Sequence, residues 1–264
     1  MSVLPFVGDD RLGTAACTAA RWLVHAQLWR PHDPDLLVTG EHETAAILLG
    51  GTFDLVGGGT AWPARGARRD PFGGRPMAVF LPPRTEFRCG NGRGEILLVA
   101  ARQPQRREEV TGRAAFASKP LLPLAGSGKS FDPTSGEWKP AETFPTAPES
   151  LPPRRFERIA VGACTIERML PPDYKAATLS LDEVVVPAGG ELRVAAIPGR
   201  PRCDETLLFV RAPGAARVFA GGREHSVRAD AVLVVAGAGD DATITAVAPT
   251  YVAIAYAGKP ASGS

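Results

Sequence analysis

Short apolar runs alternate with glycine-containing turns along most of this sequence, and no long run keeps the spacing of an amphipathic helix. Apolar runs bounded by glycine clusters are typical of β-strands joined by tight turns. The expected strands are Trp22–Trp29, Thr44–Leu49, Thr52–Val56, Met77–Leu81 and Glu95–Ala101 in the first half of the chain, and Thr178–Val186, Glu191–Ala196, Thr206–Val210, Ala216–Phe219, Ala231–Val235, Ala242–Val247 and Tyr251–Ala255 in the second. Turns are expected at Gly50–Gly51, Gly90–Gly92 and Gly221–Gly222, among others. The pattern predicts an all-β protein built from sandwiches or barrels.

The middle of the chain breaks this pattern. Residues 105–155 are rich in proline, serine, glycine and charged residues, a composition typical of linkers and long surface excursions. We therefore expect a first β-domain over residues 1–104, a linker or surface excursion over 105–155, and a second β-domain over 156–264.

The two β-rich parts follow one plan. In each part a glutamate begins an apolar strand that leads to a glycine, Glu43 before Gly50 and Glu205 before Gly214. A second apolar strand follows in each part and is stopped by a turn rich in proline or glycine. The repetition predicts two copies of one barrel.

Composition narrows the function classes. Hydrophobic residues make up 44% of the chain and charged residues 22%, which is ordinary for a soluble globular protein. The net charge is +2 and no basic stripe is present, so nucleic acid is not an expected partner. The four cysteines form no CxxC pair, which favours a reduced, cytoplasmic setting. No apolar run reaches the roughly 18 residues that cross a bilayer, and the first residues lack a signal-peptide pattern, so no membrane association is expected.

One segment carries a family resemblance. In Arg68–Arg88 a loop with two glycines leads into a short apolar strand, which stops at Pro82 and Pro83. This segment resembles one in the 5-deoxy-glucuronate isomerases of inositol catabolism, which are double-cupin proteins, and the likeness extends over residues 40–104 and, more loosely, 159–260. The resemblance implies a bicupin of two jelly-roll barrels, and an aldose–ketose isomerisation of a uronate-type sugar that uses a bound metal.

The chain departs from this family at the metal site. By the family's pattern, the two histidines of the first cupin motif fall on Arg200 and Arg202, the glutamate of the motif remains as Glu205, and the last histidine falls near Asp240 or Asp241. Arginine stays protonated and has no lone pair for a metal. The first half offers no replacement, so no metal or other cofactor is expected.

A charge network could take the place of the metal. Arg200, Arg202, Glu205 and Asp241 are two cations and two anions on strands expected to face each other, and a guanidinium can hold a carboxylate in a bidentate fork. We expect Arg200 and Arg202 to bind the substrate, Glu205 and Asp241 to act as catalytic acid and base, and Glu205 to pair with Arg202. The alternative is that all four are ordinary exposed loop charges.

The histidines form only a weak ligand set. His42 and Glu43 are adjacent, so on a strand their side chains point to opposite faces, and His32 lies ten residues earlier. His25 is expected to be partly buried, and His225 to lie in a hairpin turn.

Two functions remain open, beside a metal site in the first half. The protein could bind a sugar acid or another small polar ligand without a metal and act as an isomerase, or it could be a non-catalytic cupin with a sensor or structural role. A concave pocket that holds Arg200, Arg202 and Glu205 would favour the first function, whereas barrels filled by apolar side chains would favour the second. A homodimer is plausible in either case.

Overall fold

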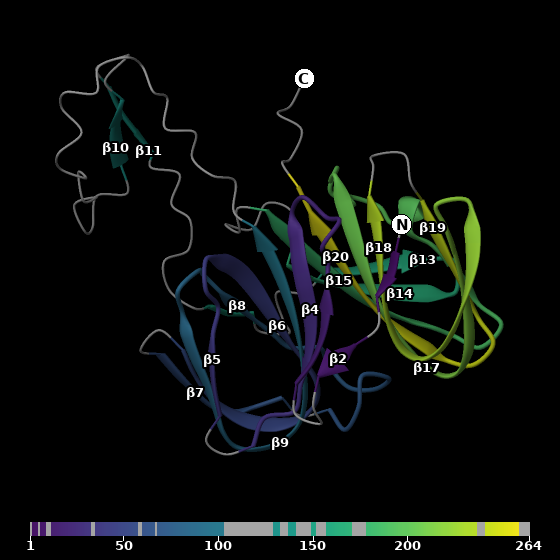
Figure 1. The fold of residues 1–264 in the computed structure, drawn as a ribbon, viewed down its shortest axis with the longest axis horizontal. Helices are drawn as coiled ribbons and strands as arrows, with labels where there is room; N and C mark the ends of the chain where they lie inside the picture. Colours follow the sequence, from purple (N-terminus) through teal and green to yellow (C-terminus); the bar gives the residue numbers. More distant parts are fainter. Residues whose placement is uncertain are drawn as a thin grey trace.

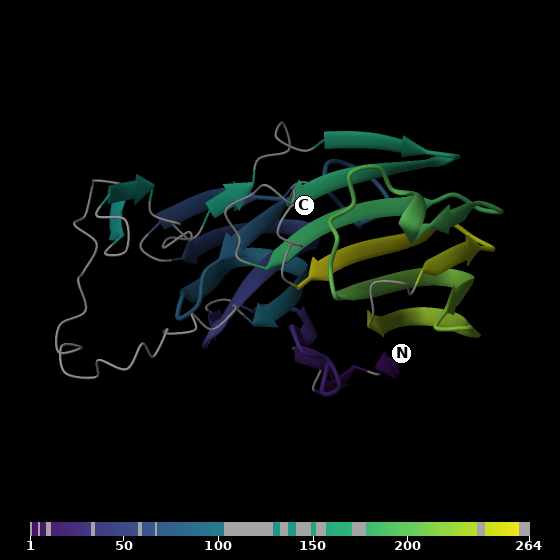
Figure 2. The same ribbon diagram turned by 90° about the horizontal axis from the view of Figure 1, so that it is seen from above.

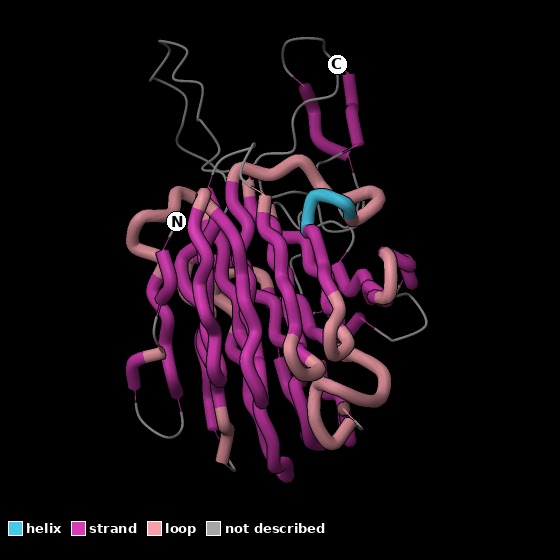
Figure 3. Tube along the Cα trace, turned by 90° about the vertical axis from the view of Figure 1, so that its right-hand side faces the viewer, coloured by secondary structure: helices cyan, strands magenta, loops and turns pink. Residues whose placement is uncertain are grey.

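The apolar runs form strands, and the strands form two nine-stranded sheets, each closed into a barrel, in a computed structural model of the protein (Figure 1). The all-β architecture of two barrels expected from the sequence is therefore confirmed. Strands run through nearly all of the described chain, and the short 3-10 helix η2 (Val194–Ala196) lies at one end (Figure 3). The structure describes residues 2–4, 6–8, 12–32, 35–57, 60–66, 68–102, 129–132, 137–140, 149–151, 157–170, 178–236 and 241–258.

Each barrel takes its strands almost entirely from one half of the chain. The N-terminal barrel contains β2 (Val7–Gly8), β3 (Leu12–Ala16), β4 (Leu23–Trp29), β5 (Asp35–Val38), β6 (His42–Gly57), β7 (Thr60–Arg65), β8 (Ala78–Leu81) and β9 (Glu86–Arg102). The C-terminal barrel contains β13 (Glu157–Val161), β14 (Cys164–Leu170), β15 (Leu179–Val186), β16 (Glu191–Arg193), β17 (Glu205–Ala220), β18 (Arg223–Ala236), β19 (Ala242–Ala246) and β20 (Thr250–Ala257). Two further strands, β10 (Lys129–Asp132) and β11 (Glu137–Pro140), pair only with each other.

Each barrel also receives one strand from elsewhere in the chain. The first strand, β1 (Ser2–Leu4), pairs with β18 of the C-terminal barrel, and β12 (Glu149–Leu151) pairs with β8 of the N-terminal barrel. The N-terminal segment therefore runs from one barrel to the other along one edge of the molecule (Figure 2). Most of the remaining 105–155 segment lies outside the described residues.

The glycines expected to make turns at 50–51 and 90–92 lie inside long strands. Strands β6 and β9 pair along nearly their whole length, and they kink at register shifts beside these glycines. A Cβ atom on Gly51 would lie 2.0 Å from the carbonyl oxygen of Arg93, and one on Gly94 would lie 2.0 Å from that of Gly50. The glycines thus permit close approach of two backbones. By contrast, Gly221 and Gly222 form the expected hairpin turn, both with positive φ.

The repeat in the sequence is a structural repeat. Glu43 pairs with Ala101 across β6 and β9, and Glu205 pairs with Ala257 at the same place across β17 and β20. Strands β6 and β17 each contain 16 residues. The barrels differ at one point, because residues 66–77 lie between β7 and β8, whereas β18 continues through the equivalent position with only a register shift against residues 212–216 of β17.

Three apolar clusters hold the fold together. One fills the N-terminal barrel, with Phe53, Trp62 and Phe87 among its members, and one fills the C-terminal barrel. The third, which we call the interface core, combines residues of both halves, such as Leu97 and Phe209. Strands such as β9 and β20 are buried on both faces and therefore contribute to an interior and to the interface at once.

A reciprocal pair of hydrogen-bonded glutamates, which we call the clasp, joins the barrels. The amides of Trp22 and Leu23, where β4 begins, donate to Glu205 Oε2 at 2.9 and 2.8 Å, and the amide of Arg21 donates to Oε1. In the other direction Thr178, just before β15, donates its amide to Glu43 Oε1 at 2.9 Å, and its hydroxyl donates to the same oxygen. Both carboxylates are buried, and such burial is tolerated because the oxygens are hydrogen-bonded.

Replacing either clasp glutamate should loosen the barrel interface. We expect Glu205→Gln to lower the free energy of unfolding by about 2 kcal/mol or more, because the amide group of glutamine can accept with only one atom and leaves a buried N–H without its acceptor. Urea denaturation measures the change. Glu224→Gln is the control, since Glu224 is exposed, and should change stability by less than about 0.5 kcal/mol. Equal stability of the two variants would show that the clasp contributes nothing.

Candidate functional site

The four residues expected to form a charge network do not come together. The carboxylate of Glu205 is held in the clasp, and Asp241 accepts hydrogen bonds from Arg193 Nε and, at 2.8 Å, from the amide of Ala195. Arg202 is exposed and Arg200 is half-buried. Among the described contacts of Glu205 there is no bond to Arg202, so the expected pairing is not found there. The binding and catalytic roles assigned to these residues stay predictions.

The position of Glu205 follows from the alternation of side chains along β17. Leu207 and Phe209 belong to the interface core, whereas Leu208 and Val210 belong to the cluster that fills the C-terminal barrel. Glu205 shares its face with Leu207, so its carboxylate points to the other barrel. In a cupin metal site the corresponding glutamate points into its own barrel.

The donor set does not fit the metal that the family resemblance implies. Among the residues that the structure describes, no three His, Cys, Asp or Glu side chains are close enough to hold a metal ion. Arginine occupies the two expected histidine positions and cannot donate an electron pair. We therefore derive no chemical step through a metal.

A buried ion pair occupies one end of the C-terminal barrel. Arg168 on β14 donates through Nε to Asp182 Oδ1 of β15 at 3.1 Å, and Tyr256 on β20 donates its hydroxyl to Asp182 Oδ2 at 3.1 Å. Arg168 also donates to the carbonyl oxygen of Pro198 at 2.9 Å. Gly199, which lies beside the guanidinium of Arg168, has a φ of 64°, a backbone conformation that favours glycine. The barrel end is thus filled by protein atoms.

The electrostatics of this ion pair reflect its burial. Burial raises the pKa of Asp182, although the bonds to Arg168 and Tyr256 act in the opposite direction. Burial likewise raises the pKa of Cys203, while its hydrogen bond with Thr206 and the charge of Arg200 oppose that rise. The sequence carries little signal for the pair, because β14 also contains Glu167 and β15 also contains Glu183.

The N-terminal barrel has a neutral counterpart of this pair and two histidines. Gln27 lies opposite Thr14 as Asp182 lies opposite Arg168, and its Nε2 is 3.4 Å from Thr14 Oγ1.

Burial, with a smaller contribution from His42, holds the pKa of His25 at about 4. Nδ1 of His42 is buried and has no hydrogen-bond partner in the part of the chain that the structure describes. His32, in contrast, is exposed.

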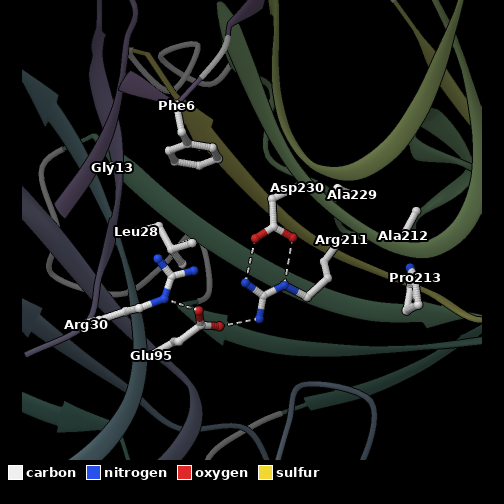
Figure 4. Close-up of a pocket in the computed structure, with 10 residues that line it drawn as sticks. All are labelled: Phe6, Gly13, Leu28, Arg30, Glu95, Arg211, Ala212, Pro213, Ala229 and Asp230. Atoms are coloured by element: carbon white, nitrogen blue, oxygen red, sulfur yellow. Dashed lines mark hydrogen bonds and ion pairs between the residues drawn. The ribbon is translucent and has the colours of Figure 1, made fainter. Parts of the chain in front are cut away.

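A pocket of about 770 Å³ lies between the two barrels (Figure 4). Four charged side chains form a chain of ion pairs along its wall, in which Arg30 and Arg211 share Glu95 and Arg211 also binds Asp230. Burial by itself would raise the pKa of Glu95, but Arg211 and Arg30 lower it. The remaining lining residues are Phe6, Gly13, Leu28, Ala212, Pro213 and Ala229. Sequence reasoning missed this pocket, because its residues come from six separate segments.

The buried ion pair should be structural. We expect Arg168→Met to lower the free energy of unfolding by about 3 kcal/mol or more, because Asp182 would remain buried without its cation. Adding Asp182→Asn should recover part of the loss, since no unpaired charge then remains, and urea denaturation measures both. Arg158→Met is the control, because Arg158 is exposed and pairs on the barrel surface. A loss no larger than that of the control would contradict a structural role.

His25 should make stability depend on pH. Its folded pKa of about 4 lies below the ordinary value of 6.5, so the unfolded chain binds the proton first as the pH falls. We expect the free energy of unfolding to decrease between pH 6.5 and pH 4, by on the order of 3 kcal/mol in total from this residue. Urea denaturation across this range should show a shallower decrease for His25→Gln, whereas His32→Gln should follow the unmodified protein. Identical profiles for all three proteins would refute the assignment.

Comparison with known proteins establishes the fold. No known protein family matches the sequence, and no curated protein is significantly similar to it. An IolB-like protein from Salmonella typhimurium superposes with a TM-score of 0.68 at 15% identity, over 98% of this chain and 93% of that one. An oxalate decarboxylase from Lactobacillus farciminis, as its formate complex, superposes with a TM-score of 0.59 at 12% identity, over 97% of this chain and 84% of that one. AerE from Microcystis aeruginosa superposes with a TM-score of 0.57 at 8% identity, over 97% of this chain and 96% of that one. Within the described residues no helix is long and apolar enough to cross a membrane. These likenesses show a cupin fold across the whole chain.

Proposed function

We propose that the protein is a cupin-fold binding protein for a small polar ligand, a sugar acid, and that its barrels do not carry out the metal-dependent isomerisation. One observation carries the proposal. At the end of the C-terminal barrel, Arg168, Asp182 and Tyr256 bond to one another and to the backbone. These contacts leave the polar groups of the barrel end committed to the fold.

The metal requirement of the isomerases that the sequence resembles supports the same conclusion. An aldose–ketose isomerisation of the family's type needs a metal to polarise adjacent carbonyl and hydroxyl oxygens. Arg200 and Arg202 stand where the motif has histidines, and the clasp holds Glu205. Acid–base catalysis by Glu205 and Asp241 is not favoured either, because each carboxylate already accepts hydrogen bonds from other groups.

The ligand class rests on resemblance and charge. The likeness to 5-deoxy-glucuronate isomerases suggests a uronate-type sugar, and the fold is shared with an IolB-like protein. Arginine side chains bind carboxylates through paired hydrogen bonds. Arg200 and Arg202 lie outside the clasp and the buried ion pair, and remain candidates for that contact beside the arginines between the barrels.

Ligand screening tests the proposal. We expect D-glucuronate, D-galacturonate or D-gluconate to raise the melting temperature, because a ligand that binds only the folded state adds about 2.7 kcal/mol of stability at a hundred times its dissociation constant. D-glucose, which has no carboxylate, should have a smaller effect. NMR of the acids incubated with the protein and Mn, Ni or Zn should show no aldose–ketose conversion.

The other outcomes are informative. Conversion that depends on an added metal would restore the isomerase as the function. No thermal shift with any of the acids would favour a structural role without a ligand of this class.

A further inference from the structure

We infer that the sugar acid of the proposed function binds in the pocket between the barrels, with Arg30 holding its carboxylate and Phe6 closing over it. The inference rests on the proposed function and adds the site, the contacts and the residue that covers them. It follows from a comparison of two grooves, one on each flank of the interface core. The two grooves occupy equivalent positions in the internal repeat.

The first groove is closed by the chain itself. Arg68, from residues 66–77 between β7 and β8, donates to Glu183 Oε1 and Oε2 at 2.7 and 3.1 Å and to the carbonyl oxygen of Leu48 at 2.8 Å. Tyr251 donates its hydroxyl to Glu183 at 2.9 Å. Phe72, from the same segment, packs against the interface core. This segment therefore acts as a plug with a polar end and an apolar end.

The second groove lacks such a plug. Here β18 passes the equivalent position without interruption, and Ala229, which pairs with Ala212 next to a register shift between β17 and β18, has a φ of 90°. A positive φ is costly for alanine and persists only where the surroundings enforce it. Asp230 is the cross-strand partner of Arg211 on β17, and its Oδ2 lies 2.6 Å from the guanidinium. The pocket is the space that the missing plug leaves open.

The most exposed charge of the pocket belongs to an arginine. Arg30 is 44% exposed, whereas Glu95 and Asp230 are 25% and 24% exposed and Arg211 is 17% exposed. The two guanidinium groups and the two carboxylates balance in charge, and Arg30 is the member of the network with the most exposed side chain. Hydrogen bonds between a guanidinium and a carboxylate are stronger than those between neutral groups.

The remaining walls suit a hydroxylated ligand. Oxygens of Glu95 and Asp230 can accept hydrogen bonds from sugar hydroxyls. The apolar side chains of Phe6 and of Leu28, which lies beside Arg30, also line the pocket and offer surface against which the C–H groups of a sugar can pack (Figure 4). A volume of about 770 Å³ lies within the range typical of small-molecule sites. A small hydroxy acid thus matches the polar and the apolar end of the pocket.

Phe6 covers the pocket from the N-terminal segment. Its ring lies 6.0 Å from that of Phe209 in an edge-to-face arrangement, and its Cβ would lie 3.3 Å from a Cβ on Gly13. The segment is tied to the C-terminal barrel by β1 and to the N-terminal barrel by β2. Phe6 therefore spans the two barrels at the pocket and loses its position if either barrel shifts.

Calorimetric titration with D-glucuronate tests the site. We expect Arg30→Gln to weaken binding by at least about tenfold, because the cation that holds the carboxylate is removed. Phe6→Ala should weaken binding roughly fivefold through lost aromatic contact. Matched controls are Arg84→Gln, an exposed arginine that also pairs through Nε with a glutamate, and Phe219→Ala, an exposed phenylalanine on the far part of β17. Both controls should bind as the unmodified protein does.

Two further results would overturn the inference in different ways. If D-glucuronate binds Arg30→Gln and Phe6→Ala normally but binds Arg200→Gln or Arg202→Gln weakly, the pocket assignment is wrong and the proposed function stands. If D-glucuronate and the other acids of the screen do not bind the unmodified protein, the proposed function fails and this site fails with it.

Discussion

The need to satisfy buried charge at the barrel interface governs much of this structure. A carboxylate removed from water must find donors, and Glu43 and Glu205 find them in the backbone of the opposite barrel. Arg68 and Glu183 meet the same requirement on one flank of the interface. These contacts have direction, unlike the apolar contacts of the interface core, so they fix how one barrel is oriented against the other.

The clasp uses a residue that a cupin would use for chemistry. Glu205 stands at the position of a motif glutamate, yet its carboxylate serves the neighbouring barrel. The interior of its own barrel instead holds Arg168, Asp182 and Tyr256, which satisfy one another. A buried ion pair of this kind contributes little net stability compared with apolar packing, but it is costly to break. The polar groups in the interior of the C-terminal barrel thereby serve the fold.

The proposed ligand site lies where the repeat is imperfect. The two barrels are copies, but only the N-terminal one carries residues 66–77, and this difference leaves one flank of the interface sealed and the other hollow. The segment around Arg68 that carries the family resemblance thus includes the plug. The plug is present on one flank of the interface and absent from the other, and the pocket lies on the flank that lacks it.

The sequence by itself determined the fold class and the internal repeat, because apolar runs, glycine turns and the two leading glutamates are local features. It could not assign the face of Glu205, since β17 is apolar on both faces and its alternation does not reveal which face is inside. It also placed turns at Gly50 and Gly90–Gly92, where two paired strands in fact pass close together. The buried pair of Arg168 with Asp182 and the pocket beside Arg211 depend on neighbours far apart in sequence. Only strand pairing and barrel packing bring those side chains together, so only the tertiary structure decided them.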